Sequence, residues 1–234
     1  MAYADVKNLL KDESGTTLIE FTAAAFTFFI VLFGIVEFSH VYYRWNAATK
    51  AVQIGARLAA VSSPVSSDLA IWNGLLLPAQ CYVDSAGAAS AAIPGAFIKT
   101  TDPACVFKRE CVSSASSGSA GTCTNGGIYN ALAMQTIVFG RGKSACAAAT
   151  TPRNLGMCNI FIGLNATQVV VNYNFTGLGY AGRPGGPVPT VTVGLRNVPY
   201  NFILLGAFLS TDTITMPSFA TTVTGEDLNA LWSS

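Results

Sequence analysis

The longest uninterrupted apolar stretch of the chain lies near its N-terminus. Between Glu20 and Glu37 stand sixteen residues without a charge, FTAAAFTFFIVLFGIV, and Leu18 and Ile19 extend the stretch on its N-terminal side. About 20 apolar residues span a bilayer as a helix, and lipid enforces the helix because it offers the backbone no other hydrogen-bond partner. The pattern therefore predicts a membrane-spanning helix.

A heptad-like seam continues beyond the apolar stretch. Its members recur with alternating spacings of three and four, a pattern typical of a helix that packs on protein. They are Phe38, Val41, Trp45, Ala48, Val52, Gly55 and Ala59. Ser62-Ser63-Pro64 ends the pattern, because proline disfavours helix in the residue before it. We expect one continuous helix from about Thr17 to Val61, with a lipid-facing first half and a packed second half.

Strand patterns appear only in the C-terminal half. QVVVNYNF (168–175) and PTVTVGLRNV (189–198) alternate and are rich in β-branched residues, which predicts strands. TDTITMPSFATTV (211–223) predicts a final strand, with Pro217 at an edge or a bulge. A short helix is expected at 128–136. The simplest fold is α+β, a long N-terminal transmembrane and stalk helix packed on an antiparallel sheet of about four strands.

Two further segments are less defined. The apolar run NFILLGAFL at 201–209 fits either helix or strand, and EDLNALW after Gly225 suggests a last short helix, since acids favour a helix N-terminus.

Composition narrows the class of protein. The chain has 234 residues, of which 51% are hydrophobic and 11% charged, with a formal net charge of +1. The charged fraction is well below the value of about 25% that is usual in globular proteins. It indicates extensive burial, in a membrane or among neighbouring subunits, and argues against a disordered chain. The small net charge gives no electrostatic reason to expect a nucleic-acid partner.

All six cysteines follow the long helix: Cys81, Cys105, Cys111, Cys123, Cys146 and Cys158. No two of them form a C-x-x-C pair, and the single histidine, His40, is far away in sequence, so no metal site is expected. An even number after an anchor indicates disulfides in an oxidising compartment, with free buried thiols as the alternative. The connectivity is open, but a pairing of Cys111 with Cys123 would close the flexible tract SSASSGSAGT (113–122) into a loop.

No residue pattern points to catalysis. Gly177–Gly182 matches G-x-G-x-x-G, but the turn-forming RPGGP follows it where a dinucleotide site needs a helix. His40 is expected at the membrane interface. Glu37 either marks the periplasmic end of the span or pairs with Arg44 or a neighbouring subunit. We therefore expect no enzyme activity, no cofactor and no small-molecule substrate.

An acid stands inside the start of the apolar run. Gly15 precedes the run, Glu20 is the fifth residue after it, and Phe21 follows. A carboxylate in a transmembrane helix costs roughly 2–3 kcal/mol near the bilayer centre and usually has a partner. A secretory signal peptide fits poorly, because the run is longer than an h-region and no convincing small-residue cleavage site follows it.

This arrangement resembles the type IV pilin processing site, in which a prepilin peptidase cuts after the glycine. The G-x-x-x-x-E-[FY] form resembles the branch that builds tight-adherence (Flp/Tad) pili. The longer stretch from Gly15 to Val61, with GIVEF at 34–38 and GARLAA at 55–60, is similar to the TadE-like minor pilin (pseudopilin) family. The segment from Ile214 to Thr222 is weakly similar to that family.

We expect four parts. The resemblance implies a prepilin leader at 1–15 and a transmembrane and amphipathic helix at 16–61, while composition and strand patterns indicate a loop-rich cysteine-containing region at 62–127 and a β-rich globular part at 128–234. It also implies a pilin-like outline for the fold. Cleavage after Gly15 would create an α-amine at Thr16, with which Glu20 of a neighbouring subunit would pair, next to Phe21, during assembly.

The implied partners are other pilin subunits, the pilus assembly machinery, prepilin peptidase and the inner membrane. The chain would cross that membrane once, with its C-terminal part in the periplasm, and then enter a surface pilus that serves adhesion. Lysines and arginines lie on both sides of the span, so the charge distribution gives no clear orientation. Two alternatives are a pilus-tip adhesin that binds through 62–127, and a permanently anchored periplasmic protein of unknown activity.

Overall fold

The computed structural model describes residues 16–148, 151, 154–182, 187–203, 206 and 213–225. The expected leader with Gly15, most of the ambiguous run at 201–209 and the expected helix after Gly225 lie outside these residues. The chain divides into two compact units. Unit 1 comprises residues up to Tyr43 together with Pro199–Ile214, and unit 2 comprises Arg44–Val198 together with the residues from Thr215 onward.

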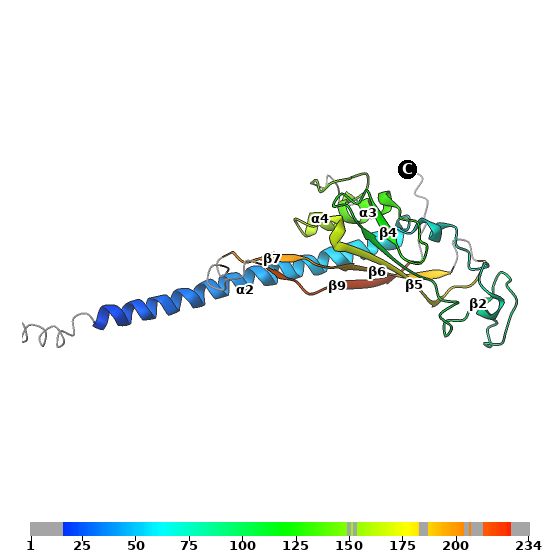
Figure 1. Cartoon of the computed structure of the whole chain (residues 1–234), viewed down its shortest axis with the longest axis horizontal. Helices are drawn as coiled ribbons and strands as arrows, with labels where there is room; N and C mark the ends of the chain where they lie inside the picture. Colours follow the sequence, from blue (N-terminus) through cyan, green and yellow to red (C-terminus); the bar gives the residue numbers. More distant parts are fainter. Residues whose placement is uncertain are drawn as a thin grey trace, which may run out of the picture. The chain divides into compact units, whose positions relative to one another are not determined.

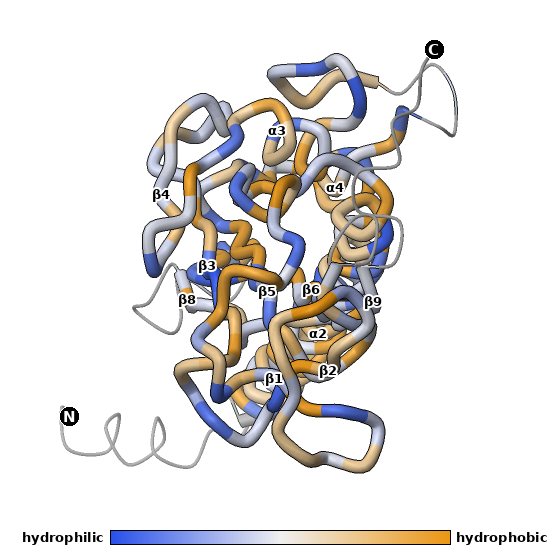
Figure 2. The backbone as a smooth tube through the Cα atoms, turned by 90° about the vertical axis from the view of Figure 1, so that its right-hand side faces the viewer, coloured by the Kyte–Doolittle hydropathy of each residue, from blue (hydrophilic) through white to orange (hydrophobic). Residues whose placement is uncertain are grey.

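Helix α2 (Thr16–Val61) is continuous over 46 residues and supplies residues to both units (Figure 1). It ends at Val61, three residues before Pro64, as the sequence predicted. Figure 2, turned by 90° from Figure 1, shows α2 nearly end-on, near β6 and β9 of unit 2. The prediction of one long N-terminal helix is therefore confirmed.

Unit 2 contains a five-stranded antiparallel sheet in the order β4-β3-β5-β6-β9 (Figure 1). The strands are β3 (Lys108–Ser113), β4 (Gly121–Cys123), β5 (Val169–Leu178), β6 (Val188–Leu195) and β9 (Phe219–Thr224). Strands β5 and β6 match the two predicted by alternation. The predicted final strand at 211–223 is wrong in its extent, because the chain breaks around Pro217. Its first part, β8 (Thr213–Thr215), pairs instead with β7 (Pro199–Asn201) in a separate two-stranded sheet.

The region 62–127 holds more regular structure than its composition predicted. Besides β3 and β4, it forms a small sheet of β1 (Tyr82–Val83) and β2 (Phe97–Ile98) and two short 3₁₀ turns, η2 (Ser67–Ala70) and η3 (Ala79–Cys81). The expectation of about four strands in the sheet was one too few, because β3 and β4 lie in this region. Their polar sequences gave no alternating pattern.

Three short helical elements complete unit 2: α3 (Ala131–Phe139), α4 (Met157–Ile160) and η5 (Ala166–Gln168). The helix expected at 128–136 begins three residues later, because the Asn130 side chain accepts a hydrogen bond from the Ala133 amide and caps the helix there. It ends at Gly140, whose φ of 96° favours glycine.

One face of the five-stranded sheet is buried. Val171, Tyr173, Val191 and Val193 are completely inaccessible to solvent, and they alternate with partly exposed residues along β5 and β6. Helix α2 packs in the same unit: its Trp45 ring meets the Phe219 ring of β9 edge-on at 4.7 Å. The mixed α+β fold, with a long helix packed on an antiparallel sheet, is confirmed.

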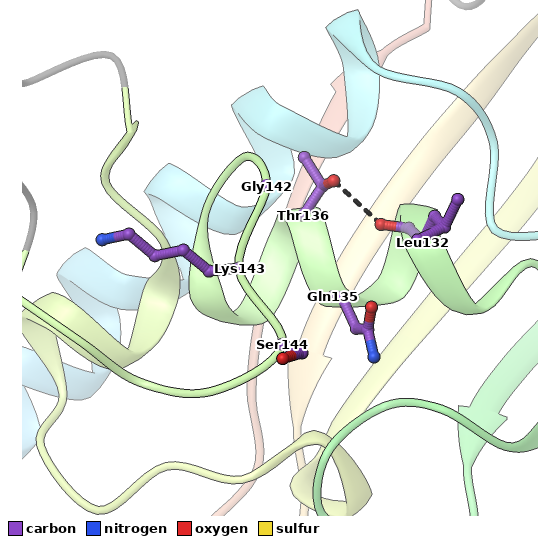
Figure 3. A pocket seen from close by; sticks show the side chains of 6 residues that line it. All are labelled: Leu132, Gln135, Thr136, Gly142, Lys143 and Ser144. Carbon is purple, nitrogen blue, oxygen red and sulfur yellow. Dashed lines mark hydrogen bonds between the residues drawn. The ribbon is translucent and has the colours of Figure 1, made fainter.

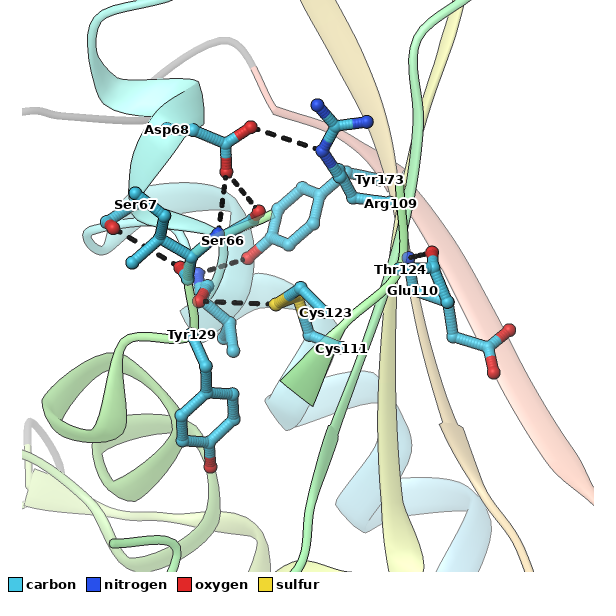
Figure 4. The surroundings of a disulfide bond; sticks show 12 residues. Ser66, Ser67, Asp68, Arg109, Glu110, Cys111, Cys123, Thr124, Tyr129 and Tyr173 are labelled. Atoms are coloured by element: carbon cyan, nitrogen blue, oxygen red, sulfur yellow. Dashed lines mark hydrogen bonds and ion pairs between the residues drawn. A yellow bond between two sulfur atoms is a disulfide. The ribbon is translucent and has the colours of Figure 1, made fainter. Parts of the chain in front are cut away.

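All six cysteines form disulfides, which excludes the free-thiol alternative: Cys81–Cys105, Cys111–Cys123 and Cys146–Cys158. Cys111 and Cys123 are directly opposite each other on β3 and β4 (Figure 4). The Thr124 amide donates to the Glu110 carbonyl, so the cysteines occupy the neighbouring, non-hydrogen-bonded pair, where two strands approach most closely. The tract at 113–122 is thus the turn of a disulfide-closed hairpin.

The chain that leaves α2 is fixed to this hairpin region. The Val65 amide donates to the Tyr173 hydroxyl at 2.9 Å, and both residues are fully buried. Asp68 forms an ion pair with Arg109 of β3 at 3.1 Å (Figure 4). Burial raises the pKa of Tyr173 above its ordinary value, and the hydrogen bond from Val65 opposes that rise.

Candidate membrane anchor and assembly helix

The first half of α2 exposes large apolar side chains. Leu18, Ile19, Phe21, Phe28 and Phe38 are each more than 60% accessible. Within the described residues, α2 is the one helix long and apolar enough to cross a membrane, and its most apolar segment is not covered by the rest of the chain. Such a surface on a soluble monomer would be unfavourable, so it requires lipid or other subunits around it.

Polar side chains inside this segment are satisfied by the helix itself. The hydroxyls of Thr22, Thr27 and Ser39 donate to the carbonyls four residues earlier, at 2.7, 2.9 and 2.8 Å. Hydroxyls bonded in this way need no water or second protein chain, so they are compatible with a lipid environment.

Glu20 differs from these hydroxyls. It lies on α2 one turn after Thr16, the first helical residue, and its side chain is exposed beside that of Phe21. Among the described residues, no hydrogen bond or ion pair reaches the Glu20 carboxylate. Gly15 lies outside the described residues, so the geometry of the expected cleavage site is not part of the structure.

Glu37 is the opposite case, since it is only 3% exposed. The Tyr200 hydroxyl donates to its carboxylate at 2.5 Å, and the Ile203 amide donates to both carboxylate oxygens at 3.2 and 3.1 Å. All three residues belong to unit 1. Neither partner was foreseen from the sequence, because both lie more than 160 residues away. The candidate pairing with Arg44 is not what the structure shows: Arg44 lies over the Phe161 ring and donates to the Ile162 carbonyl.

His40 belongs to the same cluster as Glu37 and Tyr200. Its Nδ1 lies 3.0 Å from the Tyr200 hydroxyl oxygen. Tyr200 uses its one hydroxyl proton in the hydrogen bond to the Glu37 carboxylate, so its oxygen can only accept from His40. Nδ1 of His40 therefore carries a proton and donates to the tyrosine oxygen. Glu37, Tyr200 and His40 thus form a hydrogen-bonded chain that attaches the segment after Pro199 to α2 within unit 1.

The predicted seam is buried only in its second half. Ala48, Val52, Gly55 and Ala59 are buried, whereas Val41 is partly exposed, Trp45 is 42% exposed and Phe38 is exposed. The buried stripe is also wider than the seam, since Ala51, Ala56 and Ala60 belong to it. A helix that packs in a globular unit buries a broader face than a two-stranded coiled coil does, and the alternation of threes and fours does not identify these extra positions.

Gly55 allows α2 to approach helix α4 closely. A Cβ atom at this position would lie 2.4 Å from Sδ and 2.9 Å from Cγ of Met157, a buried residue of α4. The glycine in the GARLAA stretch is therefore required by packing within unit 2.

A shallow hollow beside α3 does not resemble a catalytic site. Its six lining residues, drawn in Figure 3, are Leu132, Gln135, Thr136, Gly142, Lys143 and Ser144. None of these six is an acid, a histidine or a cysteine. The Lys143 ammonium donates to the carbonyls of Ala147 and Ala148. The ammonium of Lys143 is thus bonded to the backbone of its own loop.

Comparison with known proteins gives one family match. The family model described as TadE-like protein matches residues 15–57, which comprise the glycine before α2 and most of that helix. Searches of curated proteins and of solved structures each return no match. The match includes Gly15, Glu20, Phe21, Glu37 and the seam through Gly55. Over residues 15–57, which include most of the exposed apolar helix, this chain is thus similar to the TadE-like family.

Proposed function

We propose that this protein is a structural minor pilin, or pseudopilin, of a Tad/Flp-type pilus. It inserts in the inner membrane with its C-terminal part in the periplasm. Prepilin peptidase then removes the leader after Gly15, and the mature chain joins other pilin subunits and the assembly machinery. The role is structural, in assembling, priming or capping a pilus used for surface adhesion, and it involves no catalysis.

The single observation that supports this proposal best is the contrast between the two acids of α2. Glu37 has donors within its own chain, whereas Glu20 is exposed on an apolar helix with no partner among the described residues. An exposed carboxylate in lipid is unfavourable unless a cation joins it. The α-amine that cleavage creates at Thr16 of a neighbouring subunit is such a cation.

The test starts with the N-terminus of the protein, determined by mass spectrometry in membrane and sheared surface fractions. We expect a chain that begins at Thr16, and loss of this product in Gly15→Leu. A chain that retains its leader in cells with active peptidase would contradict the proposal and favour a permanently anchored protein.

The second step compares Glu20→Ala with Glu20→Asp, which keeps the charge. We expect Glu20→Ala to insert and to be cleaved but to be absent from the surface fraction, with at least partial incorporation of Glu20→Asp. The pairing would be refuted if Glu20→Ala entered the surface fraction as efficiently as the wild type.

A further inference from the structure

The two edges of the five-stranded sheet differ. Strand β4, at one edge, has only three residues, and a disulfide ties it to β3. Strand β9, at the other edge, has six residues, FATTVT, which include no charge and no proline. Its pairing with β6 is continuous in register from Phe219 to Thr224. Natural sheets usually protect a free edge with charges, prolines, bulges or very short strands. Strand β4 is protected in this way, and β9 is not.

The hydrogen-bond pattern shows which groups of β9 face outward. The Gly225 amide donates to the Pro189 carbonyl of β6 at 2.8 Å. Bonded and non-bonded pairs alternate along an antiparallel ladder. Every second residue before Gly225 therefore directs its backbone amide and carbonyl toward β6. These residues are Val223, Thr221 and Phe219. The amides and carbonyls of the three residues between them point to the free edge: Ala220, Thr222 and Thr224.

A second contact shows independently which residues of β6 direct their backbone groups toward β9. On the other side of β6, the Arg196 amide donates to the Gln168 carbonyl at 2.8 Å. By the same alternation, Gly194, Thr192 and Thr190 face β5, which leaves Val193 and Val191 to face β9. No backbone bond from the outward groups of β9 to another described residue is present.

Side chains at the edge are compatible with another strand. Ala220, Thr222 and Thr224 are exposed on the outer face, and the Thr222 hydroxyl lies 2.8 Å from that of Thr192. Thr221 and Val223 lie on the opposite, more buried face. An added strand would extend the threonine row on one face and the apolar row on the other.

We propose that β9 accepts an extended segment of another pilus subunit by strand addition. That segment is uncharged, with β-branched apolar residues facing inward and threonine, serine or asparagine facing outward, and it takes up the three outward amides and three outward carbonyls. The choice of a pilus subunit as partner rests on the proposed function.

A second copy of this chain fits less well. Its own other edge offers only the three residues of β4. The partner that we propose is therefore a different subunit.

Amide hydrogen exchange tests the site directly. In the purified full-length chain in detergent, we expect the amides of Ala220, Thr222 and Thr224 to exchange fast and those of Thr221 and Val223 to be protected. In the sheared surface fraction, all five should be protected. Protection of the three outward amides already in the isolated chain, or fast exchange in both samples, would overturn the proposal.

Two substitutions at position 222 distinguish loss of the outward amide of β9 from loss of the threonine side chain. Thr222→Pro removes an outward amide and blocks the edge without removing a bond to β6. Thr222→Val loses the same hydroxyl contact but keeps the amide. We expect Thr222→Pro to insert and be cleaved normally yet to fall about tenfold or more in the surface fraction, while Thr222→Val remains near wild type. Equal incorporation of both variants would refute strand addition.

These outcomes are distinct from failure of the proposed function. If the wild-type chain itself kept its leader and stayed out of the surface fraction, the pilin assignment would fail. The exchange comparison would then be made on membranes solubilised in mild detergent, against the purified chain. Unchanged exchange of the outward amides there would overturn the strand-addition proposal as well.

Discussion

Removal of the Tyr173 hydroxyl tests the contact that joins the end of α2 to the sheet of unit 2. It accepts the Val65 amide at 2.9 Å where α2 has just ended, and neither residue is accessible to solvent. Tyr173→Phe keeps the ring and its packing but leaves a buried amide without its partner. An unsatisfied buried donor costs about 1–3 kcal/mol, so we expect a loss of stability in that range.

The assay is urea-induced unfolding of the full-length chain in a mild detergent at pH 7, followed by near-ultraviolet circular dichroism. Tyr180→Phe, which removes the hydroxyl of an exposed tyrosine in the same unit, is the control and should change stability by less than about 0.5 kcal/mol. If Tyr173→Phe were as stable as this control, the Val65–Tyr173 bond would not hold the end of α2 to the sheet.

The same residue predicts a pH dependence. Burial raises the pKa of Tyr173 above the ordinary 10.0, so the folded chain keeps this proton after the unfolded chain has released it. Above pH 10 the unfolded state therefore binds fewer protons, and the free energy of unfolding falls as pH rises. Tyr173→Phe lacks this contribution, so the stability difference between wild type and variant should shrink between pH 10 and higher pH. A constant difference would show that Tyr173 ionises equally in both states.

Three further changes test other contacts. Gly55→Leu should lower the free energy of unfolding by about 1–3 kcal/mol or more, because the added side chain meets Met157 of α4. Gly34→Leu is the control and should not lower it, because an added Cβ there meets no atom within 4 Å. Thermal unfolding of the two variants makes the comparison. Replacing Cys81 and Cys105 together by serine should cost about 3–4 kcal/mol in urea unfolding, as expected for a disulfide that joins residues 24 apart. Tyr200→Phe removes the hydroxyl between the buried carboxylate and the imidazole of α2, so the amides of β7 should exchange faster, and unchanged exchange would refute that role.

The elements that could be predicted from the sequence are those specified locally. The end of α2 follows from Pro64, and β5 and β6 follow from alternating β-branched residues, whose inward members are fully buried. The membrane-spanning length follows from a count of apolar residues. Each of these features depends on a few neighbouring residues, and the fold does not override them.

Features set by distant partners were missed. Strand β3 begins with Lys108, Arg109 and Glu110, which give no alternation, and it is a strand because it pairs with β5 and is linked to β4 by a disulfide. In the same way, nothing near Glu37 indicates Tyr200 as its partner. Non-local pairing of this kind leaves no periodic signal in the sequence, so only the three-dimensional structure shows it.

The two acids of α2 therefore have separate roles, although they stand in one apolar helix and in one family motif. Glu37 is satisfied by a hydroxyl and an amide of its own chain, so its loss should weaken unit 1 in every molecule, assembled or not. Glu20 has no such contact among the described residues, so its loss should leave the isolated chain unchanged and affect only what joins it. Glu37→Gln should accordingly speed amide exchange around Ile203 in the purified protein, and Glu20→Ala should not. A chain in which both substitutions altered the isolated protein alike would show that Glu20 acts within the subunit, and the pairing between subunits would lose its basis.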